Sequence, residues 1–497
     1  MIREQLQQRE ERWLELVRRT VFAAPGHPYR RLFERAGCEF GDLRNAVRAK
    51  GLEDALEDLY DAGVYLSIEE FKGRAKIRRS GLEIESRPTL FRNPFASRGL
   101  VQRTSGSTGA PAVAVSAAAR DRHLDAYRFV EARELELDRR ARLLVRPILP
   151  SIIGLLISMS LARMGMPAHG WFAYGGSVRR AWHYRILTRY LVALARLHGV
   201  GVPAPEYLPE DDFTPIVRWL ERRLRRGERC HVCCFVTPAV RIAAAAAERG
   251  IDLAGVRFVA GGEELTPARR RVIERSGAEA YSRYWVGEVG PVGLPCRHFR
   301  RTGRLHLLSD SVAVITRPRK VPGVREPVPA LLFTTLLPMS PFVLINAEMG
   351  DTGRISPSHC DCGFARLGLP WEISGIRSYS KLTGQGMTVF VPDVLRILEE
   401  VLPQRFGGVA GDYQLIESPD RGATLELRVR SGVASAPAKV ISECFLGELR
   451  GCYGGALSTE VWRHSRALRV VFDDPVAGPT GKVLPLHLLG GFTRGTQ

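Results

Sequence analysis

The chain has 497 residues, of which 72 are Lys or Arg and 53 are Asp or Glu, so its formal net charge is +19. Apolar residues make up 45% and charged residues 25%, which excludes a disordered, collagen-like or disulfide-dense protein. The positive charge fits either a nucleic-acid-binding protein or an arginine-biased proteome. We favour the second, because no zinc-finger, helix-turn-helix or RNP-type motif accompanies the charge.

The first hundred residues show the apolar spacing of amphipathic helices at 29–36 and 52–62. The N-terminal segment is itself a charged amphipathic helix without the apolar centre of a secretory signal. The apolar stretch at 148–166 is interrupted by Pro150, Gly154 and Arg163, which predicts a buried core helix and excludes a membrane span. The nine cysteines are an odd, sparse set that favours reduced thiols. We therefore expect a cytoplasmic protein without membrane contact.

Short β-rich runs alternate with helical patterns from about residue 100. Such alternation predicts an α/β fold with a largely parallel sheet. After the Gly/Ser segment at 374–380, the pattern becomes a helix at 392–401, strands at 413–417 and 423–429, a helix at 438–450 and a strand at 468–472. We predict a large α/β domain over residues 1–375 and a small, mobile α+β lid over residues 376–497.

A loop of alternating Gly and hydroxyl residues precedes a strand-like Ala-Val-Ala-Val run. Backbone N–H groups approach a polyphosphate closely at Gly, and Ser and Thr hydroxyls donate further hydrogen bonds. The loop lacks the Lys of a Walker A motif and the spacing of a nucleophile elbow. We expect a phosphate cradle formed by Thr104, Ser105, Gly106, Ser107, Thr108 and Gly109.

This loop resembles the phosphate loop of the adenylate-forming superfamily, and the resemblance is nearest to the phenylacetate–CoA ligase branch. It extends over residues 29–488 through several motifs in order. The segment at 235–238 is similar to a strand before a helix of the branch, and Gly262 and Glu263 lie in a run similar to its G-G-E adenine-site motif. The resemblance implies a large adenylate-forming domain with mixed sheets and a small C-terminal lid.

Residues 284–290 are similar to the superfamily's Y-G-S-T-E-V-G motif. The resemblance implies that Tyr284 stacks on adenine and that Glu288 holds Mg²⁺. Trp285 replaces the first Gly of the motif, and Gly287 replaces its Thr.

Three further positions match motifs of the superfamily. Gly350 and Asp351 resemble the G-D pair whose carboxylate binds the ribose hydroxyls. Arg377 lies in a run like the G-R-S hinge, although Tyr379 stands where Asp is common. Lys482 lies in a run like the C-terminal T/S-G-K, whose Lys closes over the acyl carboxylate and the α-phosphate.

The chemistry of the residues agrees with this resemblance. Attack of a carboxylate on the α-phosphate of ATP brings anions together, so the site needs Mg²⁺, N–H donors and a mobile cation. Glu288 would supply the metal ligand, residues 104–109 the cradle, and Lys482 the cation on a closing domain.

Four Cys and His residues suit a tetrahedral Zn²⁺ site. They are Cys296, His306, Cys360 and Cys362, and they fall in the order that the resembling branch carries. Separate buried thiols are the alternative. The trio Cys230, Cys233 and Cys234 lies in an apolar run and is predicted to be core.

The resemblance assigns the acyl pocket to residues 150–176 and to the surroundings of Ala260 and Tyr284. The first segment is apolar with three aromatic residues, so an aryl or medium aliphatic acid would fit. Trp285 would shorten the pocket or pack in the core.

The favoured hypothesis is an ATP- and Mg²⁺-dependent ligase that forms an acyl-adenylate and transfers the acyl group to coenzyme A. A second hypothesis replaces coenzyme A with a carrier-protein thiol, an enzyme thiol or an amine. A third is a non-catalytic nucleotide- or nucleic-acid-binding homologue, which the residues at Trp285, Gly287 and Tyr379 motivate. The sequence is compatible with an oligomer. The ligase hypothesis does not involve nucleic acid. The positive charge would help to capture these anionic ligands.

Overall fold

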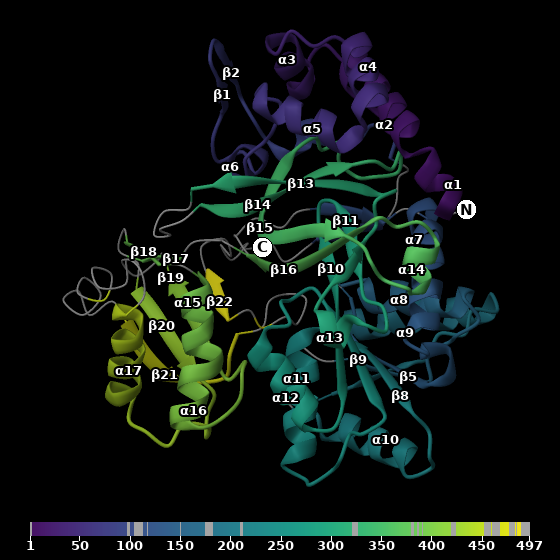
Figure 1. Ribbon diagram of the computed structural model, residues 1–497. Helices are drawn as coiled ribbons and strands as arrows, with labels where there is room; N and C mark the ends of the chain where they lie inside the picture. Colours follow the sequence, from purple (N-terminus) through teal and green to yellow (C-terminus); the bar gives the residue numbers. More distant parts are fainter. Residues whose placement is uncertain are drawn as a thin grey trace.

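The computed structural model (Figure 1) describes residues 2–96, 100–103, 113–116, 118–149, 151–173, 182–208, 212–320, 327–378, 382–384, 387–389, 391–418, 424–451, 459, 468–476, 483 and 485–488. Within these residues a 12-stranded mixed sheet forms the centre of the large domain, and a separate four-stranded sheet forms the C-terminal unit. The predicted α/β fold with a small α+β unit is confirmed.

The N-terminal helices pack on the antiparallel half of the large sheet, at the top of Figure 1. Tyr29 is fully buried there, and its hydroxyl donates to the Ile345 carbonyl at 2.8 Å. Asn346 has a φ of 49° and donates to the Leu56 and Val64 carbonyls, so it ties this turn to the helices. The elements are α1 Ile2–Gln7, α2 Arg9–Val17, the π-helical turn η1 Arg18–Phe22, α3 Pro28–Arg35, α4 Phe40–Lys50, α5 Leu52–Asp61, α6 Ile68–Phe71, β1 Ile77–Arg79, β2 Leu82–Ile84 and η2 Pro88–Phe91.

The parallel half of the sheet has the order β10-β9-β8-β5-β6-β7. Helices α10, α11 and α12 cover one face in one apolar cluster, and α7, α8 and α9 lie on the other face. The elements are α7 Ala118–Glu134, η3 Leu137–Arg139, β5 Ala141–Val145, α8 Ile153–Arg163, β6 Gly170–Ala173, α9 Trp182–Leu197, β7 Pro205–Tyr207, α10 Thr214–Leu224, β8 Cys230–Cys234, α11 Val236–Ala247, β9 Val256–Gly261, α12 Pro267–Arg275 and β10 Glu279–Val286.

The antiparallel half continues from β10 in the order β11-β12-β16-β15-β14-β13. Strand β10 belongs to both halves: Arg283 pairs with β9, while Tyr284 and the next two residues pair with β11. An irregularity between Tyr284 and Trp285 marks the change, as a bulge does when it bends a strand. The elements are β11 Gly290–Leu294, α13 Phe299–Thr302, β12 Leu305–Leu307, β13 Val312–Arg319, β14 Val328–Thr335, β15 Ala347–Pro357, α14 Gly363–Arg366 and β16 Trp371–Ser378.

Among the described residues, three two-stranded antiparallel sheets stand outside the large sheet and the four-stranded one, and the first of them pairs β1 with β2. Strands β3 Leu100–Arg103 and β4 Val113–Ser116 are antiparallel and flank the predicted phosphate cradle in the sequence. Strands β17 Leu382–Gly384 and β18 Met387–Val389 precede the C-terminal unit.

The C-terminal unit has its own apolar core, and Figure 1 shows it beside α11 and α12. Its sheet order is β21-β20-β19-β22. The large sheet continues through Ser378, the end of β16, and the separate core begins at Val394. The elements are α15 Val391–Arg396, the π-helical turn η4 Ile397–Val401, α16 Leu402–Phe406, β19 Tyr413–Ser418, β20 Thr424–Val429, α17 Ala438–Arg450, β21 Leu468–Phe472 and β22 Leu486–Leu488.

Most of the predicted elements overlap observed ones, and two predictions are wrong. The sheet that the alternation predicted to be largely parallel is mixed, as the resemblance implied, because its strands from β10 to β13 pair antiparallel. The second error concerns the segment after β8. Residues 236–238 form the first turn of α11 and not a strand. Pro238 occurs in the first turn of a helix without the loss of a hydrogen bond, because the N–H groups there have no intrahelical partner. Among the described residues, no helix combines the length and the apolar character that crossing a membrane requires.

Candidate functional site

The predicted ribose and adenine residues meet where the two halves of the sheet join. The Tyr284 hydroxyl donates to Asp351 Oδ2 at 2.7 Å, so the last part of β10 contacts β15. The Tyr284 ring lies 6.3 Å from the Phe333 ring, which belongs to β14. Two motifs that are 67 residues apart in sequence therefore form one contact.

The carboxyl group of Asp351 is electrostatically strained in this position. Burial raises its pKa to about 6, the hydrogen bond from Tyr284 acts against that rise, and the nearby charge of Glu288 adds to it. Among the described residues the only hydrogen-bond donor to this partly buried carboxylate is Tyr284. Such a carboxylate is suited to bind ligand hydroxyls, because those donors would stabilise its charged form.

The predicted metal ligand Glu288 already has a cationic partner. Its Oε1 forms an ion pair with the ammonium group of Lys72, and both side chains are nearly buried. Lys72 follows α6, so this pair joins the N-terminal helices to the turn after β10. A Mg²⁺ ion bound through Glu288 would share the carboxylate with Lys72 or displace it.

Glu263 and Gly262 form the turn after β9. Gly262 has a φ of +79°, a conformation that favours glycine. Glu263 Oε2 accepts from the Thr237 backbone N–H at 2.6 Å, in the first turn of α11. Glu263 therefore caps that helix from the inside of the protein.

The same turn of α11 contacts the C-terminal unit. The Thr237 hydroxyl donates to the Val483 carbonyl at 3.2 Å. Val483 directly follows Lys482, which lies outside the described residues. Val483 therefore contacts the body near the G-G-E turn.

Glu264 lies between the turn and the predicted hinge. Its carboxylate is 3.9 Å from Arg377 Nε in β16. Burial raises the pKa of Glu264 to about 7, Arg377 acts against that rise, and Glu399 adds to it. The charge of Asp351 also acts on Glu264, which places this side chain in the same electrostatic cluster.

A buried ion pair fastens the C-terminal unit to the body. Arg269 of α12 forms an ion pair with Glu399 of η4, with 2.7 Å between Nε and Oε1, and both side chains are 2% exposed. The Thr266 hydroxyl donates to the other oxygen of Glu399, and Arg269 lies 3.6 Å from Glu263. The three elements α12, η4 and the G-G-E turn thus share one buried charge network.

Several predicted residues lie outside the described part of the chain. They are Thr104, Ser105, Gly106, Ser107, Thr108 and Gly109 of the cradle, Tyr379 and Lys482.

The four predicted zinc ligands come together in one cluster. Their ligand atoms all lie within 4.8 Å of one another. Cys296 Sγ is 3.8 Å from Cys360 Sγ, and Cys362 Sγ is 3.0 Å from His306 Nε2. The first distance equals the edge of a tetrahedron with Zn–S bonds of about 2.3 Å, which is roughly 3.8 Å, and is far too long for a disulfide. These donors fit a structural Zn²⁺ ion.

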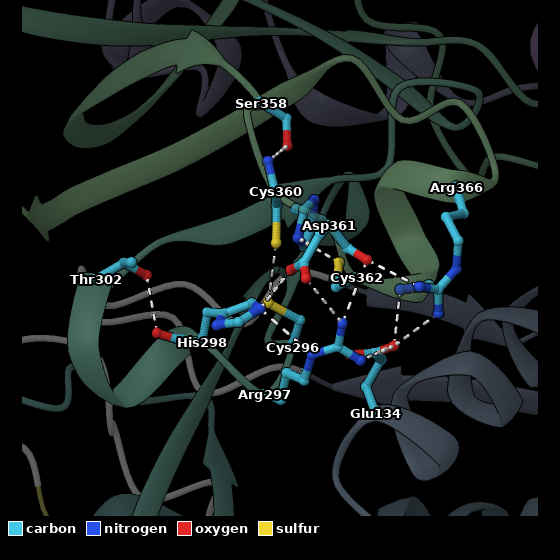
Figure 2. A network of polar contacts seen from close by, with 12 residues as sticks. Glu134, Cys296, Arg297, His298, Thr302, Ser358, Cys360, Asp361, Cys362 and Arg366 are labelled. Carbon is cyan, nitrogen blue, oxygen red and sulfur yellow. Dashed lines mark hydrogen bonds and ion pairs between the residues drawn. The ribbon is translucent and has the colours of Figure 1, made fainter.

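Three elements hold this cluster, as Figure 2 shows for its cysteines. Cys296 follows β11, His306 lies in β12, and Cys360 and Cys362 precede α14. Glu134 of α7 accepts from the Gly363 N–H at 2.7 Å, which fixes the start of α14. Cys362 is 0% exposed in a small apolar core, and Cys296 and His306 are also buried, whereas Cys360 is partly exposed.

The trio of cysteines in β8 is confirmed as core. Cys230, Cys233 and Cys234 are at most 1% exposed and face alternate sides of the sheet. Two arginines lie beside one of these thiols. Burial acts to raise the pKa of Cys233, but Arg146 and Arg283 outweigh that effect and hold the pKa below its usual value.

Sequence reasoning missed Lys72, Glu264, Arg269 and Glu399. Glu264 is the residue after the G-G-E motif, so a wider motif window would include it. Lys72 and Glu399 carry no comparable signal, because their partners are 216 and 133 residues away.

Comparison with known proteins gives structural likeness without sequence matches. No protein-family model and no curated protein sequence matches the chain. The similar solved structures include a CoA ligase and an amide bond synthetase.

In particular, an open conformation of 2-hydroxyisobutyryl-CoA ligase in complex with 2-HIB-AMP and CoA has a TM-score of 0.47 and 15% identity over 81% of each chain. The thioesterification state of that ligase has a TM-score of 0.43 and 16% identity over 98% of this chain and 89% of the other. The amide bond synthetase McbA from Marinactinospora thermotolerans has a TM-score of 0.40 and 14% identity over 96% of this chain and 92% of the other. With these TM-scores below 0.5, the functional assignment depends on the residues described above.

Proposed function

We propose that the chain is an AMP-forming, ATP-dependent acid–thiol ligase. It would convert a carboxylic acid to an acyl-adenylate and then transfer the acyl group to coenzyme A. The observation that carries the proposal is the contact between Tyr284 and Asp351 beside Glu288, which unites the adenine, ribose and metal residues of the resembling motifs.

The first step would form an acyl-adenylate. One oxygen of the acid's carboxylate attacks the α-phosphorus of ATP, and pyrophosphate leaves. Asp351 would accept the ribose hydroxyls, and Tyr284 would stack on the adenine. Residues 104–109 would cradle the phosphates and Lys482 would neutralise the developing charge. A bound Mg²⁺ would supply further charge neutralisation, with Glu288 as its protein ligand.

The second step would transfer the acyl group to sulfur. The thiol of coenzyme A attacks the acyl carbon, its proton passes to solvent, and AMP leaves with one oxygen of the original carboxylate. This step requires Lys482 to leave the site, because a thiol must approach the carbonyl. Rotation at Arg377 would break its contact with Glu264, and rotation of the lid would break the Arg269–Glu399 pair.

The domain division at residues 375 and 376 belongs to this proposal. The separate apolar core that begins at Val394 supports a two-domain division. Strand β16 runs through Ser378 and carries Arg377, which favours a boundary a few residues after 376. We also propose that Cys296, His306, Cys360 and Cys362 hold a structural Zn²⁺ ion away from the reaction site. The protein would work in the cytoplasm.

One observation favours a second candidate function, nucleotide binding without catalysis. Lys72 forms an ion pair with Glu288, and this pair would keep the carboxylate from its catalytic role. In that case ATP would bind through Tyr284 and Asp351, and no acid would be activated.

Carboxylate-dependent exchange of pyrophosphate into ATP, measured across a library of aryl, aliphatic and dicarboxylic acids, tests the proposal. The ligase predicts exchange with at least one acid and formation of its CoA thioester. Exchange without a thioester would favour a carrier-protein thiol, an enzyme thiol or an amine as acceptor. ATP binding without exchange for any acid would favour the second candidate.

A further inference from the structure

A small cavity lies between the parallel half of the sheet and helices α7 and α8. Its walls include Arg128 and Glu131 of α7, Ser160 of α8, and His231 of β8. The cavity volume is about 20 Å³. This exceeds the roughly 10–15 Å³ that one ordered water requires, so one water or one ion of similar size fits.

The charge of the cavity walls is predominantly positive. Three arginines line it, Arg128, Arg142 and Arg283, against the single carboxylate of Glu131. Both oxygens of Glu131 are already bound by Arg283, at 2.7 and 2.6 Å. The negative charge of Glu131 therefore compensates the positive charge of Arg283, and Glu131 forms no ion pair with Arg128 or Arg142 among the described residues.

Those two arginines have weak or uncharged partners. Arg128 donates to the Ser160 hydroxyl at 2.7 Å and lies 3.5 Å from Asp125, which is itself bound by Arg163 at 2.8 Å. Arg142 is 8% exposed and donates to backbone carbonyls of Pro167, Leu137, Asp138 and Arg140. Within the described part of the chain, Arg142 forms no ion pair.

A buried histidine, His231, without a hydrogen-bond partner in the described part of the chain is a second, independent sign of a ligand in this cavity. It is 2% exposed and lines the cavity, and neither ring nitrogen has a hydrogen-bond partner among the described residues. It pairs in register with Arg142 of β5, so the two side chains are neighbours on one face of the sheet. Burial and the charges of the nearby arginines keep the pKa of His231 well below its usual range. The neutral ring has one N–H to donate.

We propose that this cavity binds one small anionic atom, either a free halide ion or one oxygen of a ligand carboxylate. An anion would accept a hydrogen bond from the N–H of His231 and would also compensate the charge of the nearby guanidinium groups. A water molecule would accept the hydrogen bond but would not compensate the charge. The site is separate from the residues assigned to ATP, because Arg283 and Tyr284 are successive residues of a strand and face opposite sides.

Anomalous diffraction from crystals grown with bromide tests the proposal directly. The expected result is an anomalous peak in the cavity within hydrogen-bond distance of His231. In solution, bromide added at constant ionic strength against sulfate should raise the unfolding temperature of the wild-type protein in a saturable manner.

Two variants and a control separate this site from general salt effects. His231→Phe removes the donor and should weaken bromide binding by roughly tenfold or more, because a hydrogen bond to a charged group is lost. His231→Asn keeps an N–H donor and should retain most of the affinity. His198→Phe, at an exposed histidine of the surface, should behave as the wild type.

The two sources of the anion are separated by competition with acids. If the occupant is a ligand carboxylate, a dicarboxylic acid should displace bromide and its monocarboxylic counterpart should not. If the occupant is a free halide, neither acid displaces it. Absence of both the anomalous peak and the saturable stabilisation would overturn the proposal and leave an ordinary water site. None of these readouts requires adenylation activity, so their outcome is independent of the proposed function.

Discussion

Replacement of Asp351 by Asn should stabilise the protein without ligands while weakening ATP binding. The ionised carboxylate is costly where it lies, because burial raises its pKa from 3.8 to about 6. Each pKa unit corresponds to about 1.4 kcal/mol, so the ionised group costs about 3 kcal/mol at neutral pH. The neutral amide of Asn has a similar shape and still offers an oxygen to the Tyr284 hydroxyl.

The sign of the pH dependence follows from the raised pKa. The stability that this carboxyl group contributes to the fold is fully present at pH values below its pKa in the unfolded chain. It is lost as the pH rises through the folded-state pKa of about 6. Asp351→Asn should therefore raise the free energy of unfolding by about 2–3 kcal/mol at pH 7.5 and by only about 0.5 kcal/mol at pH 4.

Denaturant unfolding of the ligand-free protein between pH 4 and 8 measures this difference. Asp212→Asn is a matched control, because Asp212 is exposed and its hydrogen bonds with Thr214 lower its pKa. The control should show no gain at neutral pH. A variant at position 351 that is no more stable than the wild type at pH 7.5, or whose gain persists at pH 4, would refute the reasoning.

Three further predictions address the metal, the Glu288 pair and the lid. The purified protein should contain about one zinc per chain. Cys362→Ser should lose most of this zinc, and the control Cys230→Ser should keep it. Wild-type protein without zinc would contradict the assignment. Lys72→Met should lower the free energy of unfolding by about 3–5 kcal/mol, because it leaves Glu288 buried and unpaired, and Mg²⁺ should restore part of the loss; a loss without Mg²⁺ rescue would argue against a metal ligand. Lys482→Ala should reduce pyrophosphate exchange by roughly a hundredfold or more and spare thioester formation from a supplied acyl-adenylate, and equal loss of both half-reactions would contradict its role.

The sequence predicted the order of elements well because local patterns determine them. The helix at 438–450 and the strand at 468–472 have the predicted bounds. The strand expected at residues 235–238 came from the resemblance. The local sequence did not correct it, because Pro238 and its β-branched neighbours are compatible with both a strand end and a helix start. The fold class followed from the alternation of these elements.

The sequence predicted the motif residues of the candidate site, but it did not predict the residues that form ion pairs with them. Asp351 and Tyr284 were expected to serve one nucleotide, and their hydrogen bond joins them. Lys72 could not be found, since an ion pair between residues 216 positions apart leaves no periodic or spacing signal.

The segment that the resemblance assigned to the acyl pocket shows a related limit of sequence reasoning. Residues 150–176 are apolar by composition, yet the cavity beside α8 also receives charged groups from α7, β5 and β10. Arg283 was not expected there, because a strand residue reveals which face it occupies only when its neighbours in the sheet are known.

The most direct test of the central claim follows the oxygen atoms of the acid. An active acid labelled with ¹⁸O in its carboxylate is incubated with ATP, Mg²⁺ and coenzyme A, and the AMP produced is analysed by mass spectrometry. Acyl-adenylate formation predicts one ¹⁸O atom in each AMP. Unlabelled AMP, or label in inorganic phosphate with ADP as the nucleotide product, would contradict the account.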